Sequence, residues 1–263
     1  MRPRLIATDL DGTLLRSDGT LSKRTLAALR AADAAGVHLA VATARPYRAL
    51  WPLVEAHPFE GWGVCQNGAV VYHLASRERV SAVEMHEDLA RRIVTELRVA
   101  ADGVIFACES DDAFHCEPEF RAGFQAMEPP DVVYGEALDL IRAPMTKLIA
   151  HHPSMALAEL VQAATAVAGE HAVITHSGAP FIEISAAGVT KAAGVAAICE
   201  RLQVHSEEVV AFGDGHNDLA MLDWAGRSVA VANAHADVIS CVDEVTASND
   251  DDGVAIVIEA LLA

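Results

Sequence analysis

The chain has 263 residues, 52% of them hydrophobic, and a formal net charge of −18 at pH 7. This length allows one large domain or two modest ones, and the composition can bury a core. The negative charge argues against nucleic acid or an anionic membrane surface as a partner. No uninterrupted apolar run is long enough to cross a bilayer. A phosphorylated substrate stays compatible, because a bound cation and a few local basic side chains can reverse the field within a cleft.

The five cysteines are scattered and include no Cys-x-x-Cys pair; they are Cys65, Cys108, Cys116, Cys199 and Cys241. This pattern favours neither a disulfide framework nor a zinc site, so we expect core thiols. The N-terminus shows no signal-peptide pattern. Together these features predict a reduced, cytoplasmic setting.

The chain opens on an apolar run that leads into the sequence DLDGTL at residues 9–14. This pattern predicts a buried strand with functional residues at its carboxyl end. Asp9 and Asp11 project toward one side if the backbone stays extended, and Gly12 allows a steep turn beyond them. One carboxylate could attack phosphorus, and the other could protonate the departing oxygen and later activate water. Repulsion between the two would favour protonation of one of them.

Asp9 and Asp11 have two alternative interpretations. An EF-hand calcium loop fails, because its fifth, sixth and twelfth positions would be Thr13, Leu14 and Thr20. An ordinary solvated turn stays open from this stretch alone.

The next elements repeat the strand-then-helix pattern. Ser22 is a plausible cap for a helix over residues 23–35, and residues 37–42 (VHLAVA) form a second buried strand. Thr43 follows directly, where a hydroxyl beside backbone N–H groups suits a phosphate. Further on, Gln66-Asn67-Gly68 predicts a hairpin turn, which we favour over direct substrate contact by Asn67.

Residues 83–183 have an α+β pattern that differs from the strand–helix alternation on either side. We expect helices at 87–101, after Pro118 and at 155–167, with Pro129-Pro130 interrupting the chain. The expected strands are at 104–107, 113–116, 147–151, 172–176 and 181–184. We therefore predict a core formed by residues 1–82 and 187–263, with residues 83–186 as an inserted domain.

Phosphate chemistry returns after this insertion. Lys191 is at the start of a predicted helix. A cation there opposes the helix dipole unless an anion is near. Such a local conflict is expected at a functional site. Residues 208–212 (EVVAF) form another buried strand, which runs into GDGHND at residues 213–218. Asp214 and Asp218 face the same way if a helix starts between them, and their oxygens suit Mg²⁺.

In this order, the four motifs resemble those of the haloacid dehalogenase-like (HAD) superfamily: DxDGT at Asp9–Thr13, then Thr43, Lys191 and the GDxxND sequence. The insertion between the second and third motifs resembles the Cof-type phosphatase branch, class IIB, with a C2B cap. Ala44 and Ala192 replace glycines that usually follow the second and third motifs, which is a minor departure.

The resemblance implies a Rossmann-like α/β core with a parallel sheet and an inserted α+β cap. It implies a Mg²⁺-dependent phosphatase that hydrolyses small phosphomonoesters, such as sugar phosphates or phosphorylated cofactors, through an aspartyl-phosphate. Asp9 would be the nucleophile, and Asp11 the general acid and base. The implied phosphate-binding residues are Leu10, Thr43, Ala44, Lys191 and Asn217. The implied metal ligands are Asp9, Asp11 through its backbone carbonyl, Asp214, and Asp218 either directly or through water.

Other functions are compatible with some of these motifs. A phosphotransferase or phosphomutase would use the same aspartyl-phosphate, and a non-catalytic phosphate sensor could share the fold. Dehalogenation is disfavoured, because the dehalogenases of this superfamily lack the second aspartate, which is Asp11 here. The twelve histidines give no pattern typical of a zinc hydrolase. The partner expected is a small phosphorylated metabolite; its identity and the oligomeric state stay open. Five residues of the insertion could touch a leaving group, although surface or structural roles are favoured: Glu109, His115, Arg121, Lys147 and His176.

Overall fold

The computed structural model describes residues 2–57, 60–110, 113–120, 132–141 and 145–263. The chain divides into two compact units, a first unit of Met1–Ser81 with Thr190–Ala263 and a second unit of Ala82–Val189. These boundaries lie within three residues of those predicted from the sequence. Arg121 and Pro129-Pro130 lie outside the described residues. In the described part of the chain, no helix is both long and apolar enough to span a membrane.

The first unit is built on an eight-stranded sheet in the order β14-β13-β12-β1-β2-β3-β4-β5. Each pair from β14 to β3 is parallel, and β3 and β4 form an antiparallel pair. This sheet confirms the predicted α/β class and its parallel core. The strands are β1 (Leu5–Asp9), β2 (His38–Ala42), β3 (Trp62–Cys65), β4 (Val70–His73), β5 (Glu78–Ala82), β12 (Val209–Gly213), β13 (Arg227–Ala230) and β14 (Glu244–Val245).

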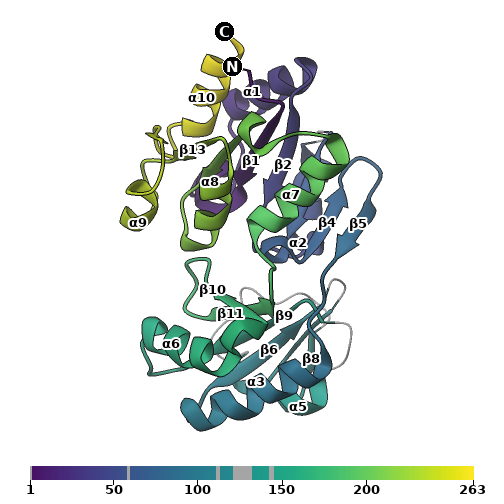
Figure 1. The fold of residues 1–263 in the computed structure, drawn as a ribbon, viewed down its shortest axis with the longest axis vertical. Coiled ribbons are helices and arrows are strands. Elements are labelled where there is room, and N and C mark those ends of the chain that lie inside the picture. The colour runs from purple at the N-terminus through teal and green to yellow at the C-terminus, as the bar shows by residue number, and fades with distance from the viewer. Residues whose placement is uncertain (1, 58–59, 111–112, 121–131, 142–144) are drawn as a thin grey trace. The chain divides into compact units, whose positions relative to one another are not determined.

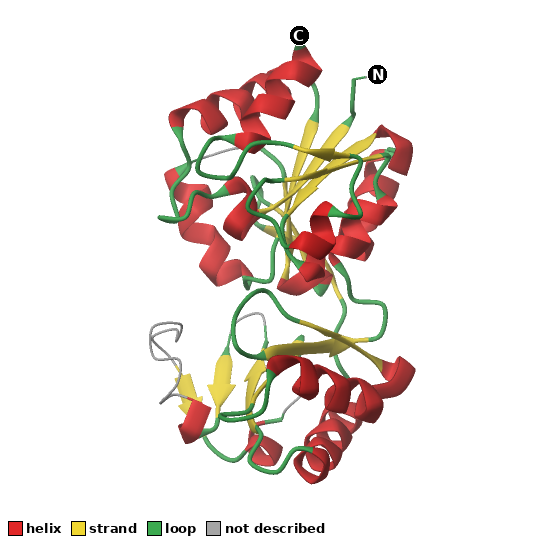
Figure 2. Ribbon diagram, turned by 90° about the vertical axis from the view of Figure 1, so that its left-hand side faces the viewer, coloured by secondary structure: helices red, strands yellow, loops and turns green. Residues whose placement is uncertain are grey.

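Helices lie on both faces of this sheet (Figure 2). They are α1 (Lys23–Ala34), α2 (Tyr47–Ala56), α7 (Lys191–Leu202), α8 (Leu219–Trp224), α9 (Ala236–Ile239) and α10 (Gly253–Leu262). Ser22 caps α1 by accepting the N–H of Thr25 at 2.9 Å, as predicted. β1 is buried on both faces, and its first three residues, Leu5–Ala7, are apolar. One of its faces packs against Val195 and Ile198 of α7.

The register of the central strands brings three predicted motifs together. β1 lies between β12 and β2, so that Thr8 is level with Phe212 and Asp9 with Ala42. Thr43 and Asp214 are therefore the first residues beyond the strands on either side of Asp9. In an open parallel sheet this carboxyl edge is where ligands bind.

The predicted hairpin between β3 and β4 is present, but its turn is longer than an Asn-Gly pair. Gln66, Asn67 and Gly68 all have positive φ, at 51°, 58° and 106°. An added Cβ at Gly68 would lie 2.0 Å from the carbonyl oxygen of Thr190, so only glycine fits there. The turn therefore packs against the start of α7.

The second unit has a six-stranded sheet in the order β10-β11-β9-β6-β7-β8 and three described helices (Figure 1). All of its pairs are antiparallel except β7 with β8. Its strands are β6 (Ile105–Glu109), β7 (Phe114–Cys116), β8 (Val132–Tyr134), β9 (Lys147–His151), β10 (Ala172–Thr175) and β11 (Ile182–Ala186). Its helices are α3 (Glu87–Ala100), α5 (Ala137–Leu140) and α6 (Leu157–Ala168).

Strand β9 shows how this sheet divides its two faces. Leu148 and Ala150 join the apolar core that packs against α3 and α6, whereas Ile149 belongs to a separate aromatic cluster with Phe114 and Phe181. Side chains alternate between the faces of a strand, which places Lys147 on the same side as Ile149. None of the cysteines, all of which lie in the described part of the chain, forms a disulfide. Four of them are buried, as expected of core thiols, whereas Cys241 is exposed.

Candidate active site

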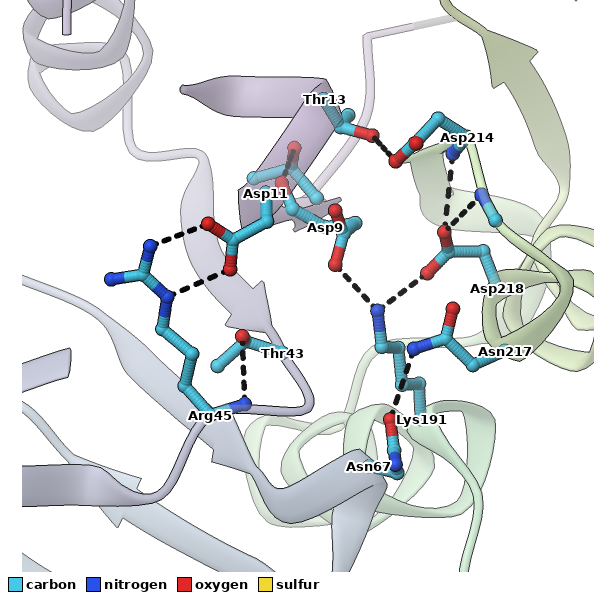
Figure 3. Close-up of polar contacts among 12 residues, drawn as sticks. Asp9, Asp11, Thr13, Thr43, Arg45, Asn67, Lys191, Asp214, Asn217 and Asp218 are labelled. Carbon is cyan, nitrogen blue, oxygen red and sulfur yellow. Dashed lines mark hydrogen bonds and ion pairs between the residues drawn. The ribbon is translucent and has the colours of Figure 1, made fainter. Parts of the chain in front are cut away.

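A buried ion cluster joins the first and last parts of the chain (Figure 3). Lys191 Nζ donates to Asp9 Oδ1 at 2.5 Å and to Asp218 Oδ1 at 2.7 Å. Lys191 is 1% exposed, so its charge depends on these two partners. A lysine at the start of α7 opposes the helix dipole, and the nearby carboxylates of Asp9 and Asp218 offset this effect.

Asp218 is fixed by its own backbone neighbours. Its second oxygen, Oδ2, accepts the N–H groups of Asp214 at 3.1 Å and Gly215 at 2.9 Å. An added Cβ on Gly213 would lie 2.5 Å from the Cβ of Asp218, so the strand end requires glycine. The loop therefore folds back on Asp218, and both of its carboxylate oxygens are engaged.

Asp214 is positioned by the opening motif. Thr13 Oγ1 donates to Asp214 Oδ1 at 2.7 Å, and a Cβ added to Gly12 would lie 2.6 Å from Asp214 Oδ2. Gly12 has φ +83°, a conformation that favours glycine. The sequence assigned no contact to Thr13, although its place in the motif was a signal.

The electrostatics of the cluster are dominated by burial. Burial raises the pKa of Asp9 well above its usual range against the opposing effect of Lys191, and it also raises the pKa of Asp214. Burial acts to lower the pKa of Lys191, but Asp218 and Asp9 outweigh it and raise that pKa. The carboxyls of Asp9 and Asp214 are therefore more easily protonated than ordinary aspartates, because burial disfavours their charged form.

The residues of this cluster fit a divalent cation. Carboxylate oxygens of Asp9, Asp214 and Asp218 lie within 4.8 Å of one another. With all groups ionised, three carboxylates and one ammonium leave two uncompensated negative charges. Asp9 Oδ2 is also buried without a hydrogen-bond donor among the described residues. Oxygen ligands and excess negative charge are what Mg²⁺ and similar ions require.

Asp11 lies differently from the expectation of two carboxylates on one side of an extended chain. The backbone does not stay extended, because residues Leu10–Leu14 form a turn that is closed by a hydrogen bond from the Leu15 N–H to the Leu10 carbonyl and in which Gly12 has positive φ. As a result Asp9 is buried, whereas the Asp11 side chain is 52% exposed. The expected repulsion of Asp9 by Asp11 is replaced by the influence of Lys191, Asp218 and Asp214.

The partner of Asp11 is an arginine that the sequence analysis did not single out. Arg45 Nε donates to Asp11 Oδ2 at 2.7 Å, and Nη2 donates to Oδ1 at 2.5 Å. Arginine binds carboxylate and phosphate groups with the same two-pronged geometry. Its position two residues after Thr43, at a strand end, was the signal that could have found it.

The predicted phosphate-binding residues lie around this cluster. Thr43 is buried next to the β1 edge, and its Oγ1 accepts the N–H of Arg45 at 3.1 Å. Leu10 is buried within the turn that follows Asp9, and its carbonyl accepts the N–H of Leu15. Ala44 follows Thr43 and is half-buried.

Asn217 is tied to the hairpin turn. Its Nδ2 donates to Asn67 Oδ1 at 3.0 Å, and Asn67 is itself buried (Figure 3). The Asn67 N–H donates to the carbonyl of Thr43 at 2.9 Å. Asn67 thus serves the turn and also links two of the predicted phosphate-binding residues.

In the second unit, two of the candidate leaving-group residues form a buried ion cluster. Lys147 Nζ lies 2.5 Å from Glu183 Oε1 and 3.2 Å from Glu109 Oε2, and all three side chains are at most 5% exposed. Burial lowers the pKa of Lys147, but the two glutamates outweigh this effect and raise it. His115 and His176 are half-buried.

Taken together, the first unit is an α/β protein whose parallel strands deliver carboxylates, a lysine and a threonine to one edge, which is the architecture of a metal-dependent phosphoryl-group enzyme. The sequence matches the haloacid dehalogenase-like hydrolases over residues 6–258, and the chain belongs to this family. This confirms the resemblance recognised in the motifs and the prediction of a hydrolase.

Individual relatives agree with this assignment. The chain is 31% identical to the 5-amino-6-(5-phospho-D-ribitylamino)uracil phosphatase YitU of Bacillus subtilis, with 97% of this chain and 96% of the relative covered. It shares its fold with a solved structure from Streptococcus mutans at a TM-score of 0.87 and 24% identity, covering 99% of each chain. A HAD subclass IIB sugar phosphatase matches at a TM-score of 0.83 and 22% identity, covering 98% of each chain.

Proposed function

We propose that this protein is a Mg²⁺-dependent phosphatase that hydrolyses small phosphomonoesters through an aspartyl-phosphate on Asp9. The observation that carries the proposal is the buried cluster in which Lys191 holds Asp9 while Asp9 Oδ2 lacks a hydrogen-bond donor among the described residues. The ion pair with Lys191 fixes the direction of the carboxylate and opposes the effect of burial on its pKa. A fixed, partly unsatisfied carboxylate is suited to attack phosphorus in its ionised form.

In the first step, the Asp9 carboxylate forms a bond to phosphorus while the bond from phosphorus to the leaving oxygen breaks. Asp11 donates its proton to that oxygen, so that the product leaves as an alcohol. Lys191 and Thr43 are assigned to the phosphoryl oxygens, together with the backbone of Leu10 and Ala44 and the side chain of Asn217. Phosphoryl transfer requires mainly such positioning and charge neutralisation.

In the second step, Asp11 takes a proton from water as the water oxygen bonds to phosphorus. The bond between Asp9 and phosphorus then breaks, which releases inorganic phosphate and restores both aspartates. Arg45 supports this role by position, because its two hydrogen bonds fix the direction of the Asp11 carboxylate. We assign Arg45 to the phosphate as well, since a guanidinium fork that holds a carboxylate can also hold phosphate oxygens.

Mg²⁺ would be held by the carboxylates of Asp9 and Asp214 and the backbone carbonyl of Asp11, and when bound it would neutralise charge on the phosphoryl group. We assign Asp218 to this ion through water. Both Asp218 oxygens already accept hydrogen bonds from Lys191 and from two backbone N–H groups, which favours an indirect contact.

The substrate class follows from the relatives, one named for a phosphorylated ribitylaminouracil and another for sugar phosphates. We propose a sugar phosphate or a phosphorylated cofactor of similar size. Residues 1–82 and 187–263 would form the catalytic core, and residues 83–186 a cap that selects the leaving group. Reduced thiols, most of them buried, fit a reducing cytoplasm.

The decisive experiment measures phosphate release from a panel of small phosphomonoesters with Mg²⁺ and with EDTA, for wild type, Asp9→Asn and Asp11→Ala. We expect metal-dependent release that is abolished in Asp9→Asn with the fold intact, and strongly reduced in Asp11→Ala while Mg²⁺ still binds. Activity near wild type in Asp9→Asn would refute the nucleophile. Release that appears only when a sugar acceptor is present would identify a phosphotransferase instead.

A further inference from the structure

Two histidines and an aspartate gather beside the loop that carries Asp214 and Asp218. His216 lies within this loop, and His235 and Asp237 lie at the start of α9. His216 Nε2 is 3.0 Å from Asp237 Oδ2, and His235 Nδ1 is 3.4 Å from the same oxygen. The two imidazole rings have centroids 4.2 Å apart. One ligand atom from each residue lies within 4.8 Å of the other two.

The distances from the two imidazole nitrogens to Asp237 Oδ2, 3.0 and 3.4 Å, are those of ligands around one metal ion. Two donors each about 2.1 Å from an ion, at tetrahedral or octahedral angles, are about 3.0 to 3.4 Å apart. Two imidazoles with one carboxylate suit a transition-metal dication such as Zn²⁺, whereas Mg²⁺ prefers oxygen ligands throughout. The side chains are 33%, 53% and 68% exposed, in the order His216, His235 and Asp237, so an ion can enter and water can complete its coordination.

Hydrogen bonds within the protein already engage these ligand atoms, and a bound cation would take their place. His216 Nε2 and Asp237 Oδ2 form one at 3.0 Å. His235 Nδ1 accepts the backbone N–H of Asp237 at 3.2 Å, so this nitrogen is unprotonated in the tautomer that the bond selects. The nearby Oδ2 of Asp237 is also an acceptor. Two acceptors 3.4 Å apart repel each other. A cation bound by both would turn this repulsion into attraction, and neutral imidazole is the form that binds metals.

We propose that His216, His235 and Asp237 form a second metal site, specific for a transition-metal dication such as Zn²⁺ and separate from the acidic cluster of Asp9, Asp214 and Asp218. The two sites share one loop. His216 belongs to the segment between Asp214 and Asp218, and the backbone N–H of His235 donates to the carbonyl of Asp214 at 2.9 Å. An ion at the second site therefore ties α9 to the loop that positions the acidic cluster.

The test uses Co²⁺, whose visible absorption reports nitrogen and oxygen coordination without any assay of activity. Co²⁺ is titrated into the full chain in a large excess of Mg²⁺, for wild type, His235→Ala, Asp237→Asn, Asp214→Asn and, as a control, His171→Ala. His171 is an exposed histidine of the second unit. We expect one Co²⁺ per chain in wild type, Asp214→Asn and His171→Ala, and an affinity at least about tenfold lower in His235→Ala and Asp237→Asn.

Two results would overturn the proposal. Co²⁺ affinity unchanged in both His235→Ala and Asp237→Asn would mean that these side chains hold no ion. Co²⁺ binding lost in Asp214→Asn but kept in Asp237→Asn would place the ion in the acidic cluster. Circular dichroism checks each variant, and Asp237→Asn keeps the size of the side chain, so it decides the matter even if His235→Ala fails to fold.

Discussion

Lys191 and Asp218 form a buried ion pair at 2.7 Å in which the aspartate, through its other oxygen, also holds the backbone of the loop before it. The lysine thus comes from the start of α7 and the aspartate from the end of the β12 loop. Asp218 therefore contacts both the ammonium that binds Asp9 and the backbone of the loop that carries Asp214. A change in Asp218 should therefore affect both charge and loop geometry.

Asp218→Asn is expected to lower kcat by roughly a hundredfold, because the amide removes one anion from Lys191 and presents N–H groups to donors. The requirement for Mg²⁺ should rise in the same variant, since the loop that carries Asp214 loosens. Both are measured as kcat against Mg²⁺ concentration. Asp223→Asn, an exposed change on α8, is the matched control. An Asp218→Asn enzyme with wild-type kcat would show that the pair is dispensable.

Arg45→Ala is expected to reduce kcat/KM by roughly tenfold to a hundredfold, because Asp11 loses a charge-assisted, two-pronged hydrogen bond. Arg45→Lys should recover only part of this loss, since lysine keeps the charge but lacks the planar fork. The measurement is the kcat and KM of both variants against Arg30→Ala, an exposed residue of α1. Full activity in Arg45→Lys would mean that charge alone is needed.

The sequence predicted the positions of the strand ends but not the contacts of the side chains beyond them. Asp9, Thr43 and Asp214 follow buried apolar runs, and this pattern is local. The Arg45–Asp11 pair depends on the turn at Leu10–Leu14, which a periodic pattern does not encode. Strand β5, with the sequence ERVSA, was missed because it is mostly exposed and has no apolar alternation.

The buried cluster of the second unit was beyond sequence reasoning for a related reason. Glu109, Lys147 and Glu183 lie on three different strands, and only the pairing register makes them neighbours. Lys147 is level with Glu109 on one side and with Ser185 on the other. A one-residue slip of register would send such a side chain to the opposite face of the sheet.

This cluster makes a prediction about stability. Lys147→Met should lower the free energy of unfolding by about 3–5 kcal/mol, because two buried glutamates lose the ammonium between them. Lys147→Met with Glu183→Gln should recover part of the loss by removing one negative charge. Urea denaturation of both variants gives the values, with Lys23→Met on the exposed side of α1 as the control. If Lys147→Met were as stable as wild type, the cluster would contribute nothing net.

The cysteines give a prediction that depends on pH. Burial raises the pKa of Cys108 to about 12 and that of Cys199 to about 11. These thiols ionise more easily in the unfolded chain, so their contribution to stability is complete below the ordinary pKa of 9.0 and is lost as pH rises toward 11–12. At pH 8 a thiol reagent should therefore modify exposed Cys241 quickly and the other four only after denaturation. Rapid reaction of a second thiol in the native protein would contradict the buried placement.

Alanine substitutions at Gly12 and Gly19 distinguish the effect of backbone strain from the effect of crowding at the active site. Both have φ near +80°, so alanine should cost about 1–2 kcal/mol of stability at either position. A Cβ at Gly19 meets nothing within 4 Å, whereas at Gly12 it would lie 2.6 Å from Asp214 Oδ2. Gly12→Ala should therefore lose about a hundredfold in kcat by displacing that carboxylate, while Gly19→Ala keeps its activity. Thermal unfolding and kcat are measured for both variants, and equal kcat values would mean that the contact of Gly12 with Asp214 has no role in catalysis.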